Sequence, residues 1–158
     1  MYKRVVVPLD GSPVAEGMLH FIVDIAAPLD MELTLLRVIR PQPPQVTETS
    51  RVVVVEDIQA RLAEAREYLA PLADELRLKG IRVRTAVRRG EPVDEIIAGA
   101  RDCGADLIAM TTHGRSGLGR LLFGSVAEAV LRRAEIPVFL MRMTKVQVTA
   151  MTAKEALS

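Results

Sequence analysis

A glycine-rich, basic segment at residues 111–125, TTHGRSGLGRLLFGS, has the composition of a phosphate-binding loop. The apolar run before it, residues 106–110, is typical of a buried strand, and the amphipathic stretch after it, residues 126–133, is typical of a helix. Glycine lets the backbone approach an anion closely, and the N–H groups of a helix's first turn point toward that anion. The segment contains Arg115 and Arg120 and no acidic residue. It therefore predicts a site for a phosphate-bearing ligand, with a nucleotide as the leading candidate.

Two common phosphate-binding motifs do not match this segment. Residues 119–125, GRLLFGS, lack the lysine of a Walker A loop, G-x-x-x-x-G-K-[ST]. The dinucleotide fingerprint G-x-G-x-x-G needs a third glycine where Leu122 stands, and it follows a first strand rather than a fourth. Both motifs are set aside. The remaining alternative is a long βα connection that binds no ligand.

Strands and helices alternate along the chain. Strands are predicted at residues 4–9, 31–39, 81–87, 106–110 and 137–141, and helices at residues 13–27, 56–79, 93–103 and 126–133. The alternation predicts an α/β fold, a doubly wound open five-stranded parallel sheet of order 3-2-1-4-5 with helices on both faces. Pro71 is expected to kink or interrupt the long helix, and Gly80 to end it. We expect one domain at residues 1–143 and a C-terminal tail at residues 144–158.

This strand order brings the first and fourth strands together where the order reverses, and ligands bind there beyond the carboxyl ends of the strands. The segments that leave these strands, residues 8–12 and 110–114, are expected to meet at one pocket. The candidate ligand-binding residues are Pro8, Leu9, Asp10, Ser12, Met110, Thr111, Gly114, Arg115, Gly117, Gly124, Ser125 and Val126.

Several of these residues also have a plainer interpretation. The Asp10 carboxylate suits ribose hydroxyls or a Mg²⁺ ion beside phosphates, but it could instead serve only a turn in Asp-Gly-Ser. Ser12, followed by Pro13, is expected to cap the first helix. Ser125 could likewise be only an N-cap. Arg115 faces either a phosphate or solvent.

Residues 4–19, RVVVPLDGSPVAEGML, and residues 110–142, MTTHGRSGLGRLLFGSVAEAVLRRAEIPVFLMR, closely resemble the universal stress protein family. The resemblance covers nearly the whole chain, except residues 41–56 and the tail after Met143. The family's nucleotide-binding motif is a glycine, two residues, a glycine, nine residues, and then glycine followed by serine or threonine. Gly114, Gly124 and Ser125 match this motif, whereas Thr111 stands at the first glycine. Threonine keeps the backbone N–H, but its β-branched side chain resists unusual dihedral angles.

The resemblance implies a ligand and an assembly. The ligand is ATP, or AMP or ADP, with the possible ion Mg²⁺ held at Asp10. Asp10 would contact the nucleotide, and Val38 matches the position whose backbone recognises adenine, although by sequence alone Val38 is simply a core residue. The family also forms homodimers through its last strand. A stress-response regulator is the function that the resemblance implies.

The amino-acid composition limits the partners and the compartment that we expect for the protein. The chain has 158 residues, of which 49% are apolar and 3% aromatic, and its net charge of +1 argues against bulk electrostatic binding to nucleic acid or membranes. A single cysteine, Cys103, excludes an internal disulfide and fits a reducing cytoplasm. No apolar stretch approaches the roughly 18 residues that a membrane helix requires. We expect a cytoplasmic protein with no nucleic-acid or membrane partner.

No catalytic constellation is recognised in the sequence. A G-x-S-x-G elbow is absent. A phosphoacceptor receiver domain would need an aspartate at the end of the third strand, where Val87, Arg88 and Arg89 stand. The sequence favours an ATP-binding regulator over an enzyme. The alternatives are a slow ATPase or autokinase, and an interaction module that has lost nucleotide binding.

Two further segments carry expectations of assembly. Residues 41–50 are expected to be mobile, and the valine run at residues 51–55 to cover the sheet or a partner, with a helical extension as the alternative. The strand at residues 137–141, PVFLM, is apolar as in a strand buried on both faces, yet it lies at the sheet's edge. Its unpaired backbone groups favour a homodimer about a two-fold axis. The alternative is that the tail covers this edge, with Val146 and Val148 in a short strand.

Overall fold

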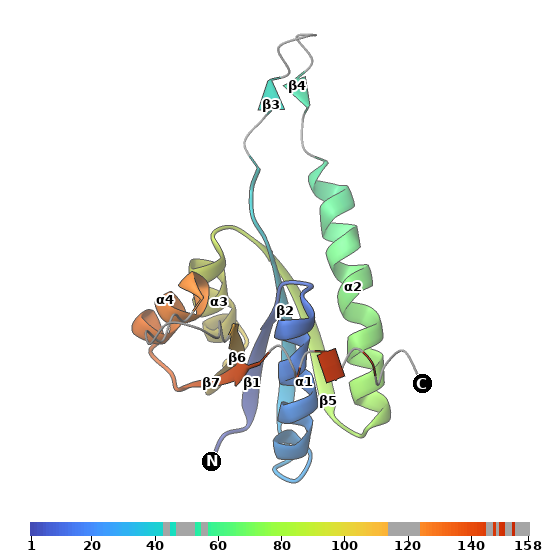
Figure 1. The fold of residues 1–158 in the computed structure, drawn as a ribbon, viewed down its shortest axis with the longest axis vertical. Helices are drawn as coiled ribbons and strands as arrows, with labels where there is room; N and C mark the ends of the chain where they lie inside the picture. The colour runs from blue at the N-terminus through green and yellow to red at the C-terminus, as the bar shows by residue number, and fades with distance from the viewer. Residues whose placement is uncertain are drawn as a thin grey trace.

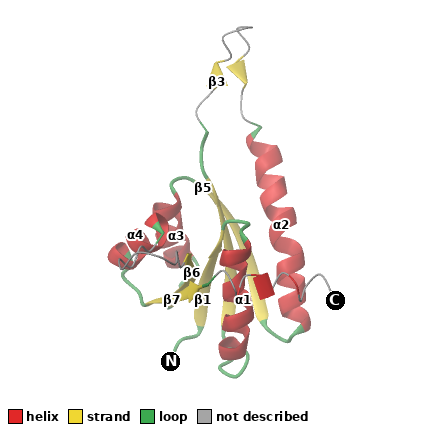
Figure 2. Cartoon of the chain, viewed as in Figure 1, coloured by secondary structure: helices red, strands yellow, loops and turns green. Residues whose placement is uncertain are grey.

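The computed structural model describes residues 1–42, 45–46, 53–54, 57–113, 124–144, 147, 149–150 and 153. Strands and helices alternate in it as shown in Figures 1 and 2. In chain order they are β1 (Arg4–Leu9), α1 (Pro13–Ala26), β2 (Glu32–Ile39), β3 (Gln45–Val46), β4 (Val53–Val54), α2 (Ile58–Leu78), β5 (Arg82–Arg89), α3 (Pro92–Asp102), β6 (Leu107–His113), α4 (Ser125–Arg133) and β7 (Val138–Met143). Five strands form a parallel sheet of order β5-β2-β1-β6-β7, which confirms the predicted order 3-2-1-4-5.

Helices cover both faces of the sheet, as predicted. Helices α1 and α2 pack on one face and α3 and α4 on the other. Two hydrophobic cores result, the first between the sheet and helices α1 and α2, and the second between the sheet and helices α3 and α4. Because successive side chains of a strand point to opposite faces, Val5 and Val7 of β1 lie in the first core and Val6 lies in the second. The unbroken apolar run of β1 therefore serves both cores. None of the helices in the described part of the chain is long and apolar enough to cross a bilayer.

The ends of the first two helices follow from local sequence. Ser12 caps α1, because its Oγ accepts a hydrogen bond from the Ala15 N–H at 3.2 Å, and Pro13 is the first helical residue. Helix α2 ends before Gly80, which has a φ of +81° that favours glycine. The Gly80 N–H donates to the Arg77 carbonyl at 2.9 Å. Both predicted signals are confirmed.

Pro71 does not interrupt α2, which runs unbroken from Ile58 to Leu78. The predicted break is therefore wrong. Pro71 itself is exposed, whereas Leu69 and Ala73 on either side of it are fully buried in the first core. Burial of one apolar face on both sides of the proline holds the two halves of the helix in register, despite the lost backbone hydrogen bond.

The fourth and fifth strands of the sheet run further than predicted. β6 continues past residue 110 to His113, and β7 continues past residue 141 to Met143, because Thr111, Thr112 and His113 pair with residues 141–143. Met143 is buried against α1, where a Cβ on Gly17 would lie 2.5 Å from the Met143 Cε. The residues Thr111–His113 thus belong to a strand, not to the glycine-rich loop.

Strands β1 and β6 part at their carboxyl ends. β1 pairs with β2 along its whole length, but with β6 only at Val5 and Val6. The Lys3 carbonyl accepts from Glu32 of β2 and the Arg4 carbonyl from Asp106 beside β6, so the even-numbered residues of β1 turn their backbone groups toward β6. Pro8 is the next such residue after Val6, and it has no N–H to donate. The ladder cannot continue there, and a crevice opens.

The described part of the valine run, Val53 and Val54, does not lie on the large sheet. Val53–Val54 forms β4, which pairs antiparallel with Gln45–Val46 of β3 in a separate two-stranded sheet. Figure 1 shows this hairpin beyond the N-terminal end of α2, away from the five-stranded sheet. For Val53 and Val54, the expected cover of the sheet and the alternative helical extension are both wrong, because β-branched residues favour strand pairing. Contact with a partner stays a prediction. The other residues of the segment 43–56 before α2's cap lie outside the described part.

The described residues of the tail are helical, not extended. Residues 147, 149, 150 and 153 are in helical conformation, whereas Val146 and Val148 lie outside the described residues. Gln147 Oε1 accepts from the Thr144 N–H at 2.9 Å, and the Gln147 N–H donates to Thr144 Oγ1 at 3.3 Å. This is a reciprocal capping box of the form T-x-x-Q. The alternative of a short strand in the tail is wrong for residues 147, 149, 150 and 153.

One side-chain hydrogen bond ties α1 to α2. The Tyr68 hydroxyl of α2 donates to Glu16 Oε1 of α1 at 2.7 Å. Burial of the phenol, and then its bond to the Glu16 carboxylate, raises the pKa of Tyr68 above its ordinary value. Both effects disfavour the phenolate in the folded state.

Replacing Pro71 with alanine should stabilise the protein. Pro71→Ala restores the N–H that the helix lacks at an exposed position, which favours the folded state. Alanine also gives the unfolded chain more conformational entropy, which offsets part of this gain. The free energy of unfolding should rise by about 1–3 kcal/mol before that offset. Chemical denaturation measures the change. The exposed Glu64 of the same helix supplies a control, since Glu64→Ala should change stability by less than about 0.5 kcal/mol. A less stable Pro71→Ala protein would contradict the account.

Tyr68 should resist ionisation in the folded protein. Tyr2→Phe leaves Tyr68 as the sole tyrosine. Its phenolate absorbance should then appear only well above pH about 10, the ordinary tyrosine value. Because the folded state raises this pKa, the stabilisation is complete below about pH 10 and is lost as the pH rises beyond it. A second substitution, Glu16→Gln, removes the carboxylate charge and should lower the pKa. Half-titration near pH 10 in folded Tyr2→Phe protein would disprove the coupling.

Candidate functional site

A cavity of about 560 Å³ lies at the carboxyl ends of the central strands, where β1 and β6 part. This volume is within the range of about 300–1,000 Å³ that is typical of small-molecule sites. Every predicted site residue that the structure describes lines it: Pro8, Leu9, Asp10, Ser12, Val38, Met110, Thr111, Gly124, Ser125 and Val126. Gly114, Arg115 and Gly117 lie outside the described residues. Segments far apart in sequence therefore meet at one cavity.

The turn after β1 places one carboxylate at the cavity. Asp10 Oδ1 accepts a hydrogen bond from the Ser12 N–H at 2.9 Å, and Gly11 between them has a φ of +86°. The turn role of Asp10 and the capping role of Ser12 are thus both present. They do not exclude ligand contact, because Asp10 is exposed and lines the cavity, and no described residue donates to its Oδ2.

The N-terminus of α4 forms the opposite wall. Gly124 is the N-cap, with no side-chain capping bond, and Ser125 is the first helical residue, so the N-cap role considered for Ser125 is wrong. The first-turn N–H groups of a helix have no intrahelical acceptor, and they carry the positive end of its dipole. A Cβ added to Gly124 would meet no atom of the other described residues within 4 Å. This wall therefore offers open, uncapped donors to an anion.

Thr112 anchors that helix end, and the sequence did not single it out. Its side chain is only 5% exposed, and its Oγ1 accepts from the Gly124 N–H at 3.3 Å. The bond joins the end of β6 to the start of α4 across the glycine-rich loop. Thr112 was placed in that loop because the strand was predicted to end at residue 110. Its β-branched side chain was the signal that favoured a strand there.

Val38 lies in an apolar part of the cavity. The other apolar lining residues there are Leu36, Pro92, Ile96 and Met110. The Ile39 carbonyl accepts from Gly90 on the β5 side, so alternation turns the backbone of Val38 toward β1, which has ended at Leu9. A flat apolar ring in this pocket would find a strand-edge backbone beside it.

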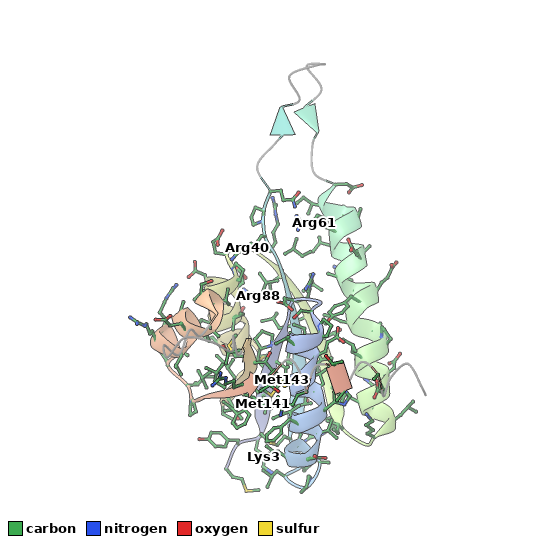
Figure 3. The ribbon with its side chains drawn as sticks, viewed as in Figure 1. Lys3, Arg40, Arg61, Arg88, Met141 and Met143 are labelled. Carbon is green, nitrogen blue, oxygen red and sulfur yellow. The ribbon has the colours of Figure 1, made fainter. Side chains whose placement is uncertain are left out.

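Three arginines of the cavity wall were missed by the sequence analysis: Arg37, Arg40 and Arg61. Arg37 interrupts the apolar strand β2, which was a usable signal. Arg61 comes from α2, and its Nη1 donates to the Arg40 carbonyl at 2.9 Å. Figure 3 shows the two side by side where β2 leaves the sheet. No local pattern could pair them, because a long connection separates them in sequence.

The charge of the described lining favours an anion. It contains these three arginines and a single carboxylate, Asp10. A cavity lined mainly by one sign of charge concentrates ligands of the opposite sign. Among the described residues there is no group of three or more His, Cys, Asp or Glu side chains that could hold a metal ion.

Comparison with known proteins gives a consistent result. The model of the universal stress protein family matches residues 1–142. Universal stress protein MJ0531 of Methanocaldococcus jannaschii is 33% identical over 147 residues, which cover 92% of this chain and 85% of that protein. Universal stress protein YxiE of Bacillus subtilis is 28% identical over 148 residues, covering 90% and 100% of the two chains.

A solved structure agrees with the sequence matches. The structure of MJ0577 of M. jannaschii superposes with a TM-score of 0.72 at 30% identity, covering 90% of this chain and 97% of that one. Together with the family match over residues 1–142, these similarities show that the chain belongs to the universal stress protein family.

Proposed function

We propose that this protein binds an adenine nucleotide, ATP or its relatives AMP and ADP, in the cavity between β1 and β6, and acts as a nucleotide-responsive regulator. The observation that carries the proposal is a convergence. The uncapped N-terminus of α4, the Asp10 carboxylate and the apolar pocket at Val38 line the same cavity. These are the three kinds of surface that phosphate, ribose and base require.

The phosphates are assigned to the N-terminus of α4. Gly124 leaves room for an oxygen atom to approach the backbone, and the N–H groups of Ser125 and Val126 can donate to it. Helix dipoles favour negative charge at this end. Gly114, Arg115 and Gly117 would complete this phosphate site from the adjoining loop.

The ribose is assigned to Asp10 and the adenine to Val38. A carboxylate at the end of a strand in a doubly wound sheet can accept hydrogen bonds from ribose hydroxyls. The Oδ2 of Asp10 is the atom in position for this, since Oδ1 already serves the turn. The same carboxylate is the residue that would hold Mg²⁺ beside the phosphates.

A related structure supports the choice of an adenine nucleotide. A universal stress protein solved in complex with cAMP is 26% identical to this chain, with a TM-score of 0.62, and the match covers 89% of this chain and 97% of that one. A regulatory role, rather than catalysis, is favoured by the described lining. Asp10 is the sole carboxylate in it, and none of its described residues is a histidine.

Gly124→Val should weaken ATP binding by more than about tenfold, or 1.4 kcal/mol, because the branched side chain occupies the approach to the α4 N-terminus. Gly124→Ala should weaken it less. Both variants should melt close to the parent protein, because none of the described residues beyond its chain neighbours has an atom within 4 Å of the added Cβ, and the φ of −56° suits any residue. Calorimetry measures the affinity, and mass analysis of nucleotide released by denaturing the parent protein identifies the ligand. Unchanged ATP affinity in both variants would contradict the assignment of the phosphates to the N-terminus of α4.

We also propose a homodimer that pairs through β7. This strand is at one edge of the sheet, and its residues Val138–Met141 are only half-buried. Beside it, Phe139 stacks on Phe21 with ring centroids 5.4 Å apart, and Phe21 is still 42% exposed. A second copy of β7 would satisfy the edge and cover these rings.

The opposite edge is protected by charge, which makes it a poor partner. β5 carries four arginines, Arg82, Arg84, Arg88 and Arg89. Arg82 pairs with Asp30, which precedes the neighbouring strand β2, and Arg84 pairs with Glu32 of β2, at 3.2 Å each. Charged side chains along an edge oppose pairing with a second sheet. β7 has a single charged residue, Arg142.

Light scattering on the full chain and on a version that ends at Met143 tests the dimer. Both should have the mass of two chains, because the pairing uses β7 and not the tail. A monomeric full chain with a dimeric shortened one would show that the tail covers the edge instead. Two monomers would overturn the proposed interface.

A further inference from the structure

Three arginines of the cavity have no part in the proposed recognition of phosphate, ribose and base. Arg37 lies near the end of β2, Arg40 directly follows that strand, and Arg61 lies in the first turn of α2. The 5′-phosphates are assigned to α4, which follows β6. β1 lies between β6 and β2 in the sheet, so the arginines stand on the other side of Asp10 from those phosphates.

Arg37 is held beside the turn that carries Asp10. Its Nη1 donates to the Leu9 carbonyl at 3.4 Å, and its guanidinium lies over the Tyr68 ring at 5.3 Å. A Cβ on Gly11 would be 3.3 Å from the same Nη1. An arginine has five N–H groups in a planar fork, and the bond to Leu9 is the sole hydrogen bond that the Arg37 guanidinium makes to a described residue. The guanidinium thus keeps donors available beside Gly11, at the wall of the cavity.

Arg40 is the second arginine of the cavity wall. Its side chain is exposed and lines the cavity, and its backbone carbonyl is held by Arg61. No described carboxylate pairs with Arg37 or Arg40. Arg88, one strand away, shows the contrast, since Glu95 and Asp102 bind it at 2.6 and 2.7 Å. The charge of Arg88 is neutralised inside the fold, whereas that of Arg37 and Arg40 faces the cavity.

We propose that Arg37 and Arg40 recognise a second phosphate on the ribose of the bound nucleotide. The preferred ligand is then an adenosine nucleotide phosphorylated at the 2′ or 3′ hydroxyl as well as at the 5′ position. Asp10 accepts from the hydroxyl that stays free, and the arginines bind the phosphorylated one. In dinucleotide sites a carboxylate binds a free ribose 2′-hydroxyl, whereas a nearby arginine accommodates a 2′-phosphate. Planar guanidinium groups suit phosphate because they donate two parallel hydrogen bonds.

This inference rests on the proposed function, and calorimetry can test the two separately. The probes are AMP, adenosine 2′,5′-bisphosphate and adenosine 3′,5′-bisphosphate, titrated into the full chain at one fixed salt concentration. At least one bisphosphate should bind more than about tenfold tighter than AMP, the ratio expected for one added charge-assisted contact. The isomer with the larger preference identifies the hydroxyl.

Arg40→Gln and, separately, Arg37→Gln should reduce that preference to less than about threefold while both proteins still bind AMP. Arg89→Gln is the matched control. Arg89 lies opposite Ile39 at the end of β5, is exposed and does not line the cavity, so the variant removes an equal charge nearby and should keep the preference. Thermal melting establishes whether each variant is folded. If Arg37→Gln does not fold, Arg40→Gln alone tests the inference.

Each outcome of these titrations supports or overturns the inference. Equal affinity for AMP and both bisphosphates in the parent protein overturns the inference and leaves the proposed function intact. A preference that persists in Arg40→Gln, or that falls equally in Arg89→Gln, also overturns it, because the effect would then come from overall charge. If neither AMP nor ATP binds the parent protein, the proposed function and this inference fail together.

Discussion

The site depends on a backbone hydrogen bond that the central strand cannot make. Pro8 occupies the place in β1 where the next N–H toward β6 would stand, and proline has none to donate. The two strands are therefore paired only at Val5 and Val6 and separate beyond them. At their other end the Asp106 carboxylate accepts from the backbone N–H groups of Lys3 and Arg4 at 2.9–3.1 Å. Strands closed at one end and open at the other give a crevice with a rigid floor.

The residues that line this crevice also hold neighbouring strands, turns and helices in place. Asp10 and Ser12 shape the turn and cap α1, and Thr112 holds the first residue before α4. Arg37 binds the Leu9 carbonyl and covers Tyr68, whose hydroxyl in turn binds Glu16. Each contact limits the freedom of a group that faces the cavity, so a ligand would meet donors and acceptors already in position. Such preorganisation lowers the entropy lost on binding.

Local sequence patterns were sufficient to predict most of the fold. The caps at Ser12 and Gly80 and the alternation of strands with helices all depend on neighbours in sequence, and each was confirmed. The errors arose where distant contacts override local preference. Pro71 stays helical because Leu69 and Ala73 are buried against the sheet, and β6 and β7 lengthen because they pair with each other. The capping box of Thr144 and Gln147 was a local signal that could have been read.

The sequence by itself determined the strand order, the family and the segments that line the cavity, because strand pattern, glycine spacing and turn residues act over a few positions. It also named lining residues on β1, β2, β6 and α4, since an open parallel sheet forms its crevice at the strands' carboxyl ends. Only the tertiary structure decided that Arg40 meets Arg61 and that Thr112 reaches Gly124. Those pairs join residues far apart in the chain, and their contact depends on how strands and helices pack, which no local pattern encodes.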